Sequence, residues 1–172
     1  VSTSCASTSA RAARTCCIAR RFVTEAHPKN ATIIAKITAF LDRVGIPAVA
    51  GPIEEETLLP GLAVQGGTLR FDPERLTWPG DLLHEAGHIA VTDPALRGEV
   101  GDVDPDPGAE MAAIAWSYAA ALEIGIDPAI IFHEGGYRQV GGGSAVLQNF
   151  STGKYIGAPM LQWYGMTAEP HQ

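Results

Sequence analysis

One short segment, Leu83-His84-Glu85-Ala86-Gly87-His88, holds side chains that could bind and use a metal ion. Residues four apart lie on one face of a helix with Cβ atoms about 5–6 Å apart, so His84 and His88 could share one ion. Imidazole nitrogens bind Zn²⁺ at about 2.0–2.1 Å. Glu85 would lie about 100° further round the helix, beside the ion. There it could take a proton from an attacking water and pass it to a leaving amine, so the segment predicts a zinc site with Glu85 as the catalytic base.

The residues around the motif favour a buried helix from about Gly80 to Val91. Leu82 and Leu83 precede it, and Ile89-Ala90-Val91 follow it. A glycine inside a helix costs about 1 kcal/mol relative to alanine. Gly87 therefore predicts that another part of the chain approaches the helix closely at this point.

A catalytic zinc site needs a third protein ligand. Glu110 lies 22 residues after His88, in the first turn of an alanine-rich helix expected over residues 108–124. A buried carboxylate is costly unless it is paired or bound to a metal, so Glu110 is the predicted ligand. Alternatively, it complements the helix dipole from the surface. Rival ligands, or acceptors for a histidine N–H, are Asp93, Asp102, Asp104 and Asp106.

A glycine-rich stretch further on could supply the group that stabilises a developing oxyanion. It contains His133, Tyr137 and Arg138. Donors of this kind stabilise the charge that forms on the carbonyl oxygen during hydrolysis. Of the three, His133 and Tyr137 are predicted to take part in catalysis.

The two metal-binding segments together resemble the ImmA/IrrE family of zinc metallopeptidases, which are gluzincin-like. The resemblance rests on the first motif and on Glu110-Met111-Ala112-Ala113-Ile114-Ala115-Trp116-Ser117, with Ala113 three residues and Trp116 six residues after the glutamate. Ile114 departs from the asparagine that the family often has. The resemblance covers roughly residues 30–124. It implies a minimal zincin core, His84, His88 and Glu110 as ligands, Glu85 as the base, and an intracellular protein as the substrate.

Residues 1–29 differ in composition from the rest of the chain. They hold all three cysteines, five of the 12 basic residues and one of the 19 acidic residues. We expect a disordered arm similar to a transit peptide, or the product of a misplaced translation start. Residues 30–172 then form one domain with a net charge of −11, which argues against nucleic acid or an anionic membrane as a partner. A domain without cysteine suits the reducing cytoplasm.

The predicted fold class is α+β, with helices around the zinc site and a small antiparallel sheet. A helix is expected from Asn30 to Gly45, and Gly66-Gly67 predicts a hairpin between residues 62–65 and 68–71. Short helices are expected over Pro128–Phe132 and Ala158–Gly165, and none over Gly135–Gly143. The preferred function is hydrolysis of peptide or protein substrates. The alternatives are a catalytically silent, zinc-stabilised binding module and a metal-free helical interaction domain.

Overall fold

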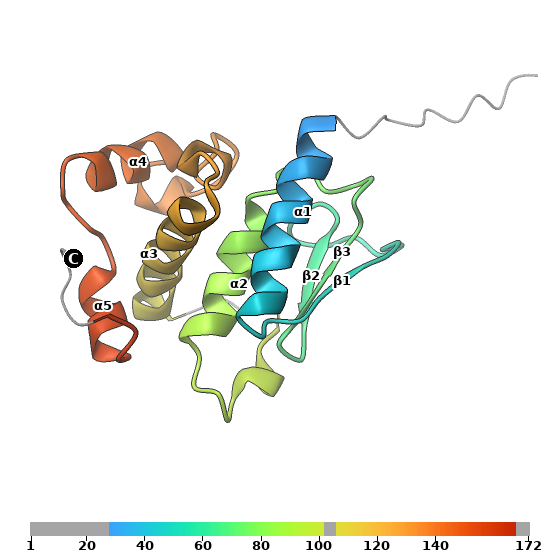
Figure 1. Ribbon diagram of the computed structural model, residues 1–172, viewed down its shortest axis with the longest axis horizontal. Helices are drawn as coiled ribbons and strands as arrows, with labels where there is room; N and C mark the ends of the chain where they lie inside the picture. The colour runs from blue at the N-terminus through green and yellow to red at the C-terminus, as the bar shows by residue number, and fades with distance from the viewer. Residues whose placement is uncertain (1–27, 102–105, 168–172) are drawn as a thin grey trace, which may run out of the picture.

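The computed structural model describes residues 28–101 and 106–167. The described chain is α+β, with five α-helices, three short 3₁₀ helices and one three-stranded sheet (Figure 1). In chain order the elements are α1 (Pro28–Arg43), β1 (Ala48–Ala50), β2 (Leu62–Gln65), β3 (Thr68–Phe71), α2 (Asp81–Val91), η1 (Arg97–Glu99), α3 (Pro107–Ile124), η2 (Pro128–Ile130), η3 (Arg138–Val140), α4 (Gly143–Ser151) and α5 (Ala158–Trp163). The arm predicted for residues 1–29 lies outside the described residues as far as residue 27, whereas residues 28 and 29 belong to α1.

The predicted hairpin is confirmed, but the predicted antiparallel sheet is wrong in one respect. Strands β2 and β3 pair antiparallel, and Gly66 and Gly67 in the turn have φ of +56° and +70°, as a type I′ turn requires. Strand β1 pairs parallel to β3 on its other side, so the sheet is mixed. Residues 51–61 reverse the chain between β1 and β2, and β1 is too short for its residue pattern to indicate its direction.

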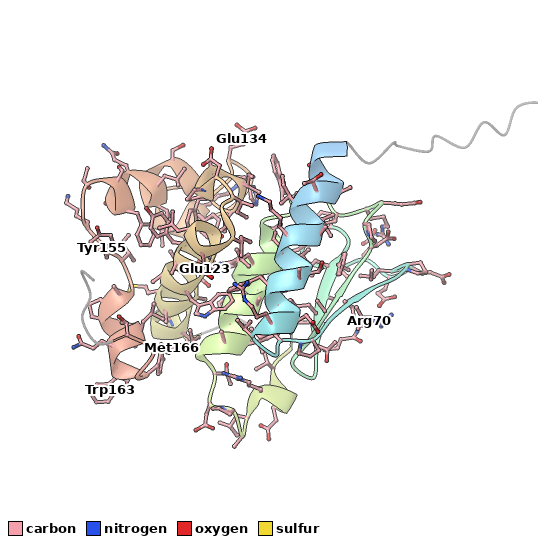
Figure 2. All side chains as sticks on the ribbon, viewed as in Figure 1. Arg70, Glu123, Glu134, Tyr155, Trp163 and Met166 are labelled. Atoms are coloured by element: carbon pink, nitrogen blue, oxygen red, sulfur yellow. The ribbon has the colours of Figure 1, made fainter. Side chains whose placement is uncertain are left out.

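Helix α2 lies at the centre of the molecule, between the sheet and α1 on one side and α3 on the other (Figure 1). Helices α4 and α5 lie beyond α3. An exposed ion pair of 3.0 Å links Arg43 at the end of α1 to Glu123 of α3, a residue that Figure 2 labels. Such an exposed pair contributes little to stability, so the helices are held together mainly by their apolar faces.

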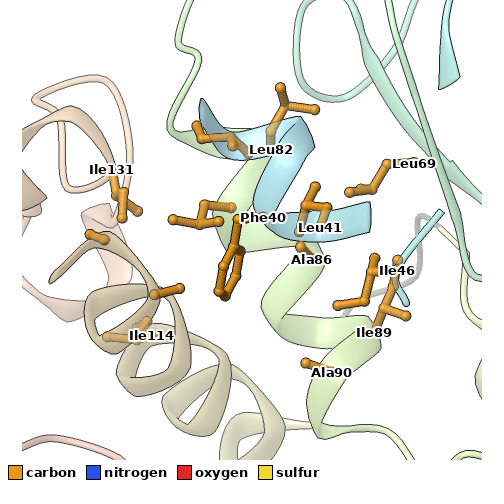
Figure 3. Close-up of a cluster of buried hydrophobic side chains, with 14 of the residues drawn as sticks. Phe40, Leu41, Ile46, Leu69, Leu82, Ala86, Ile89, Ala90, Ile114 and Ile131 are labelled. Atoms are coloured by element: carbon orange, nitrogen blue, oxygen red, sulfur yellow. The ribbon is translucent and has the colours of Figure 1, made fainter. Parts of the chain in front are cut away.

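One cluster of buried side chains connects these elements. Phe40 and Leu41 of α1, Leu82 and Ile89 of α2, and Ile114 of α3 all belong to it (Figure 3). The cluster continues to Leu161 in α5. Because α2 is surrounded by this core, its position and rotation are tightly determined.

The C-terminal half agrees only in part with the sequence predictions. Helix α5 is confirmed, and the short helix after Pro128 is a 3₁₀ turn. The stretch 135–143 contains the 3₁₀ turn η3, and helix α4, which buries Val146 and Phe150 one turn apart, was not predicted. Among the described residues, no helix combines the length and the apolar character that crossing a membrane requires.

Candidate metal centre

The three motif residues form the accessible stripe of an otherwise buried helix. Every residue of α2 is buried except His84, Glu85 and His88, which are partly exposed. The apolar neighbours on both sides of the motif pack into the core and leave only this stripe facing outward. The helix therefore presents two imidazoles and a carboxylate together.

Gly87 allows α3 to come close enough to place Glu110 beside this stripe. A Cβ atom at residue 87 would lie 2.8 Å from the carbonyl oxygen of Ala113 and 3.1 Å from its Cα. The close neighbour that the sequence predicted at Gly87 is therefore the backbone of α3. Glu110 lies three residues before Ala113, about one turn nearer the start of α3, and its side chain points back to the histidines.

The distances among the predicted ligands suit one metal ion. The Nε2 atoms of His84 and His88 are 3.3 Å apart. Glu110 Oε1 lies 3.6 Å from Nε2 of His84, and Glu110 Oε2 lies 3.2 Å from Nε2 of His88. Ligands at about 2.0–2.1 Å in tetrahedral geometry stand about 3.3–3.4 Å apart. The two Nε2 atoms therefore stand at the spacing of two ligands on one ion, and each oxygen of Glu110 faces one of them.

Glu85 also lies close to the two histidines. Ligand atoms of His84, Glu85 and His88 all lie within 4.8 Å of one another. This distance allows the Glu85 carboxylate to contact a water molecule held between the histidines and Glu110.

The protonation states also favour a cation. Burial lowers the pKa of His84 to about 4 and outweighs the opposite effect of the Glu110 charge. Burial alone would raise the pKa of Glu110, but the hydrogen bond from His88 and the charges of both histidines lower it overall. At neutral pH the site therefore holds a neutral His84 and an ionised Glu110, the forms that bind metal ions. The Nδ1 atoms of both histidines are buried, and no described protein atom accepts a hydrogen bond from them.

Two of the four rival ligands, Asp93 and Asp106, have other hydrogen-bond partners. Asp93 is exposed and accepts a hydrogen bond from the N–H of Ala95 at 2.8 Å. Asp106 caps α3 by accepting from the N–H of Ala109 at 3.2 Å. Asp102 and Asp104 lie outside the described residues.

His133 and Tyr137 lie behind the motif rather than in the opening in front of it. Nε2 of His133 is 2.8 Å from Oδ1 of Asp81, its Nδ1 accepts from the N–H of Gly135 at 3.2 Å, and its ring stacks on Trp78 at 4.3 Å. Both nitrogens of His133 are thus engaged inside the protein.

Tyr137 makes a more direct contact with the site. Its ring stands edge to face against His84, with ring centroids 5.2 Å apart. Its hydroxyl is buried without a hydrogen-bond partner among the described residues, and burial raises the pKa of this phenol. Its φ of +59° is the only positive value among the described non-glycine residues. A bulky side chain in this region marks local strain, which is often found at functional sites.

The histidines, Glu85 and Glu110 open into a cleft with a volume of about 550 Å³. Its other walls come from the segment before β2, from the start of β2, from residues 99–101 and from the beginning of α3. Sequence reasoning did not identify Leu58, Leu59, Glu99 or Val100 as part of this site. Nothing in their spacing relates them to the motif. A bridge from Leu59 to Leu62 and a hydrogen bond from the N–H of Gly67 to the carbonyl of Val100 connect these segments to the hairpin.

Comparisons with protein-family models, with curated proteins and with solved structures find no significant match to this chain. The family resemblance of the two motifs therefore stays a prediction.

Proposed function

We propose that the chain is a zinc-dependent peptidase with a zincin-like core. The observation that carries the proposal is the convergence of His84, His88 and Glu110 at the edge of a cleft, with the two Nε2 atoms 3.3 Å apart and Glu85 beside them. Two imidazoles and one carboxylate form a donor set that suits zinc and leaves one coordination position open for chemistry. When bound, zinc would polarise the peptide carbonyl and lower the pKa of the attacking water to near 7.

The chain's own residues account for the remaining steps. Glu85 accepts the proton that the attacking water loses and delivers it to the amine of the departing peptide. The buried residues of α2 hold Glu85 at a constant distance from the ligand atoms, so this transfer needs no rearrangement of the helix. Of the two further residues predicted to take part in catalysis, Tyr137 is better placed than His133. The ring of Tyr137 contacts that of His84, whereas both nitrogens of His133 are engaged in hydrogen bonds inside the protein.

The proposed substrate is a peptide or protein segment, and the proposed compartment is the cytoplasm. The cleft opens beside a β-strand and is large enough for several side chains of an extended chain. Residues 28–172 contain no cysteine, which suits a reducing compartment.

The test compares wild type with Glu85→Gln after loading both with zinc. A digest of cellular peptides is incubated with each protein, and new termini are identified by mass spectrometry. Wild type is expected to cut a defined set of peptides. Glu85→Gln should be slower by about 10²–10⁴-fold, because glutamine has the shape of glutamate but cannot accept the proton.

Metal content and a control variant make the result decisive. Glu85→Gln should keep its zinc, and Glu134→Gln, an exposed residue that does not line the cleft, should cut like wild type. If wild type and Glu85→Gln hold the same peptides and neither cuts them, the protein is a zinc-stabilised binding module. Loss of zinc from Glu85→Gln would make Glu85 a ligand and refute the assigned role.

A further inference from the structure

The lining of the cleft in front of the motif includes an apolar set of side chains, named the apolar wall, and an acidic set, named the acidic wall. The apolar wall consists of Leu58, Leu59, Leu62 and Val100, and Leu58 is 83% exposed although it is a large aliphatic residue. An exposed leucine at the mouth of a cleft can become buried when a ligand binds, and burial of apolar surface favours binding. This wall fits an aliphatic side chain.

The acidic wall consists of two carboxylates that the proposed chemistry does not use. Glu99 and Asp106 line the cleft with the motif residues, and no lysine or arginine is among the described residues that do so. The double charge of a zinc ion would offset Glu85 and Glu110. The cleft then keeps the two negative charges of Glu99 and Asp106, inside a domain that is itself strongly acidic. A concave surface with one sign of charge concentrates ligands of the opposite sign.

The acidic wall is held in place by the fold. Arg97 donates from Nη2 to the carbonyl of Ala90 at 2.9 Å and from Nε to that of Thr92 at 3.2 Å, which ties η1 to the end of α2. The N–H of Gly67 donates to the carbonyl of Val100 at 3.0 Å, which ties the following residues to the hairpin. Asp106 is held by its role as the cap of α3. The two carboxylates therefore occupy defined places relative to the metal ligands.

We propose that this cleft selects extended peptides in which an aliphatic side chain lies within a few residues of a lysine or arginine. The inference rests on the proposed peptidase function, and it adds the class of substrate. The aliphatic side chain contacts Leu58 and Leu59, and the cationic side chain faces Glu99 and Asp106.

The test uses short fluorescent peptides that share one sequence except at two positions. One position carries lysine, glutamine or glutamate, and the other carries leucine or alanine. Binding is measured by fluorescence anisotropy on zinc-loaded Glu85→Gln, and cleavage is measured with wild type. The lysine peptide is expected to bind about fivefold or more tightly than the glutamate peptide, and added salt should reduce this preference.

Variants of the two walls connect the preference to these residues. Glu99→Gln and Asp106→Asn should each weaken binding of the lysine peptide by about 1.5- to 5-fold, and asparagine keeps the cap of α3. Glu134→Gln is the matched control, because Figure 2 shows Glu134 pointing outward from the segment before α4. Leu58→Ala should weaken binding of the leucine peptide by about three- to tenfold, whereas Leu122→Ala, exposed on α3 outside the cleft, should have no effect.

The outcomes separate this inference from the proposed function. Cleavage of lysine and glutamate peptides with equal efficiency would overturn the inference and leave the peptidase intact. So would a preference that survives in the Glu99→Gln, Asp106→Asn double variant. Preferential binding without any cleavage by wild type would support the selectivity of the cleft and refute the peptidase. Absence of both binding and cleavage would refute both.

Discussion

Replacing Gly87 by alanine tests the close approach of α2 and α3 on which the position of Glu110 depends. The new Cβ would lie 2.8 Å from the carbonyl oxygen of Ala113, 3.1 Å from its Cα and 3.2 Å from its Cβ. Favourable contacts between carbon atoms begin at about 3.5 Å, so the two helices must separate by several tenths of an ångström. Because Glu110 belongs to α3, this movement also changes its distance to His84 and His88.

Two opposing effects determine the change in stability. Alanine is favoured over glycine in a helix by about 1 kcal/mol. Overpacking of a well-packed interior typically costs about 1–3 kcal/mol. Here the obstacle is helix backbone, which cannot move aside as the end of a flexible side chain can. We therefore expect the overpacking cost to exceed the propensity gain and the free energy of unfolding to fall by up to about 2 kcal/mol.

The assay is urea denaturation of the metal-free proteins, followed by titration with zinc. Gly51→Ala serves as the control, because no atom lies within 4 Å of the Cβ it would add. Its free energy of unfolding should stay within about 0.5 kcal/mol of that of wild type. A Gly87→Ala protein that is as stable as wild type, or more stable, and binds zinc equally well would show that this glycine does not position α3.

Three further predictions concern individual side chains. Glu110→Gln should lower zinc affinity more than about 100-fold, because about 100-fold is the largest loss expected for a residue that only orients a ligand. Asp93→Asn should leave zinc affinity unchanged. In a competition assay with a zinc-binding dye, a large loss in Asp93→Asn together with wild-type affinity in Glu110→Gln would make Asp93 the ligand. Tyr137→Phe should have a free energy of unfolding equal to or higher than that of wild type, because the buried hydroxyl of Tyr137 has no hydrogen-bond partner among the described residues. A loss above about 1 kcal/mol in urea denaturation would show that the hydroxyl has such a partner. The pKa of His84 is about 4 when folded and near 6.5 when unfolded, so the unfolded state binds more protons between these values. Metal-free wild type should therefore lose up to about 3 kcal/mol relative to His84→Asn as the pH falls from 6.5 to 4, and parallel pH profiles of the two proteins would contradict this.

Features set by local residue patterns could be predicted from the sequence. The spacing of His84 and His88 places both on one helix face, and Gly66-Gly67 specifies a tight turn whatever the rest of the chain does. Glu110 could be predicted because a carboxylate in an apolar helix needs a partner, and the structure places it beside both histidines. Gly87 indicated a close neighbour, although only the structure identifies the neighbour as α3.

Features set by contacts between distant segments could not be predicted. The hydrogen bond of His133 with Asp81 joins residues 52 apart, and neither has a local pattern that indicates the other. Strand β1 has three residues, which is too few for a periodic pattern, so its parallel pairing was missed. Helix α4 follows a glycine-rich stretch that obscured its start, and it has only Val146 and Phe150 to mark a buried face.

The location of zinc in a crystal of natively purified protein tests the central claim most directly. Diffraction data collected on both sides of the zinc absorption edge reveal the position of the ion and its contacts. The account predicts one zinc ion bonded at about 2.0–2.2 Å to Nε2 of His84, Nε2 of His88 and a carboxylate oxygen of Glu110, with Glu85 nearby but unbonded. An ion bonded to Glu85 in place of Glu110, or no zinc between the two histidines, would contradict it.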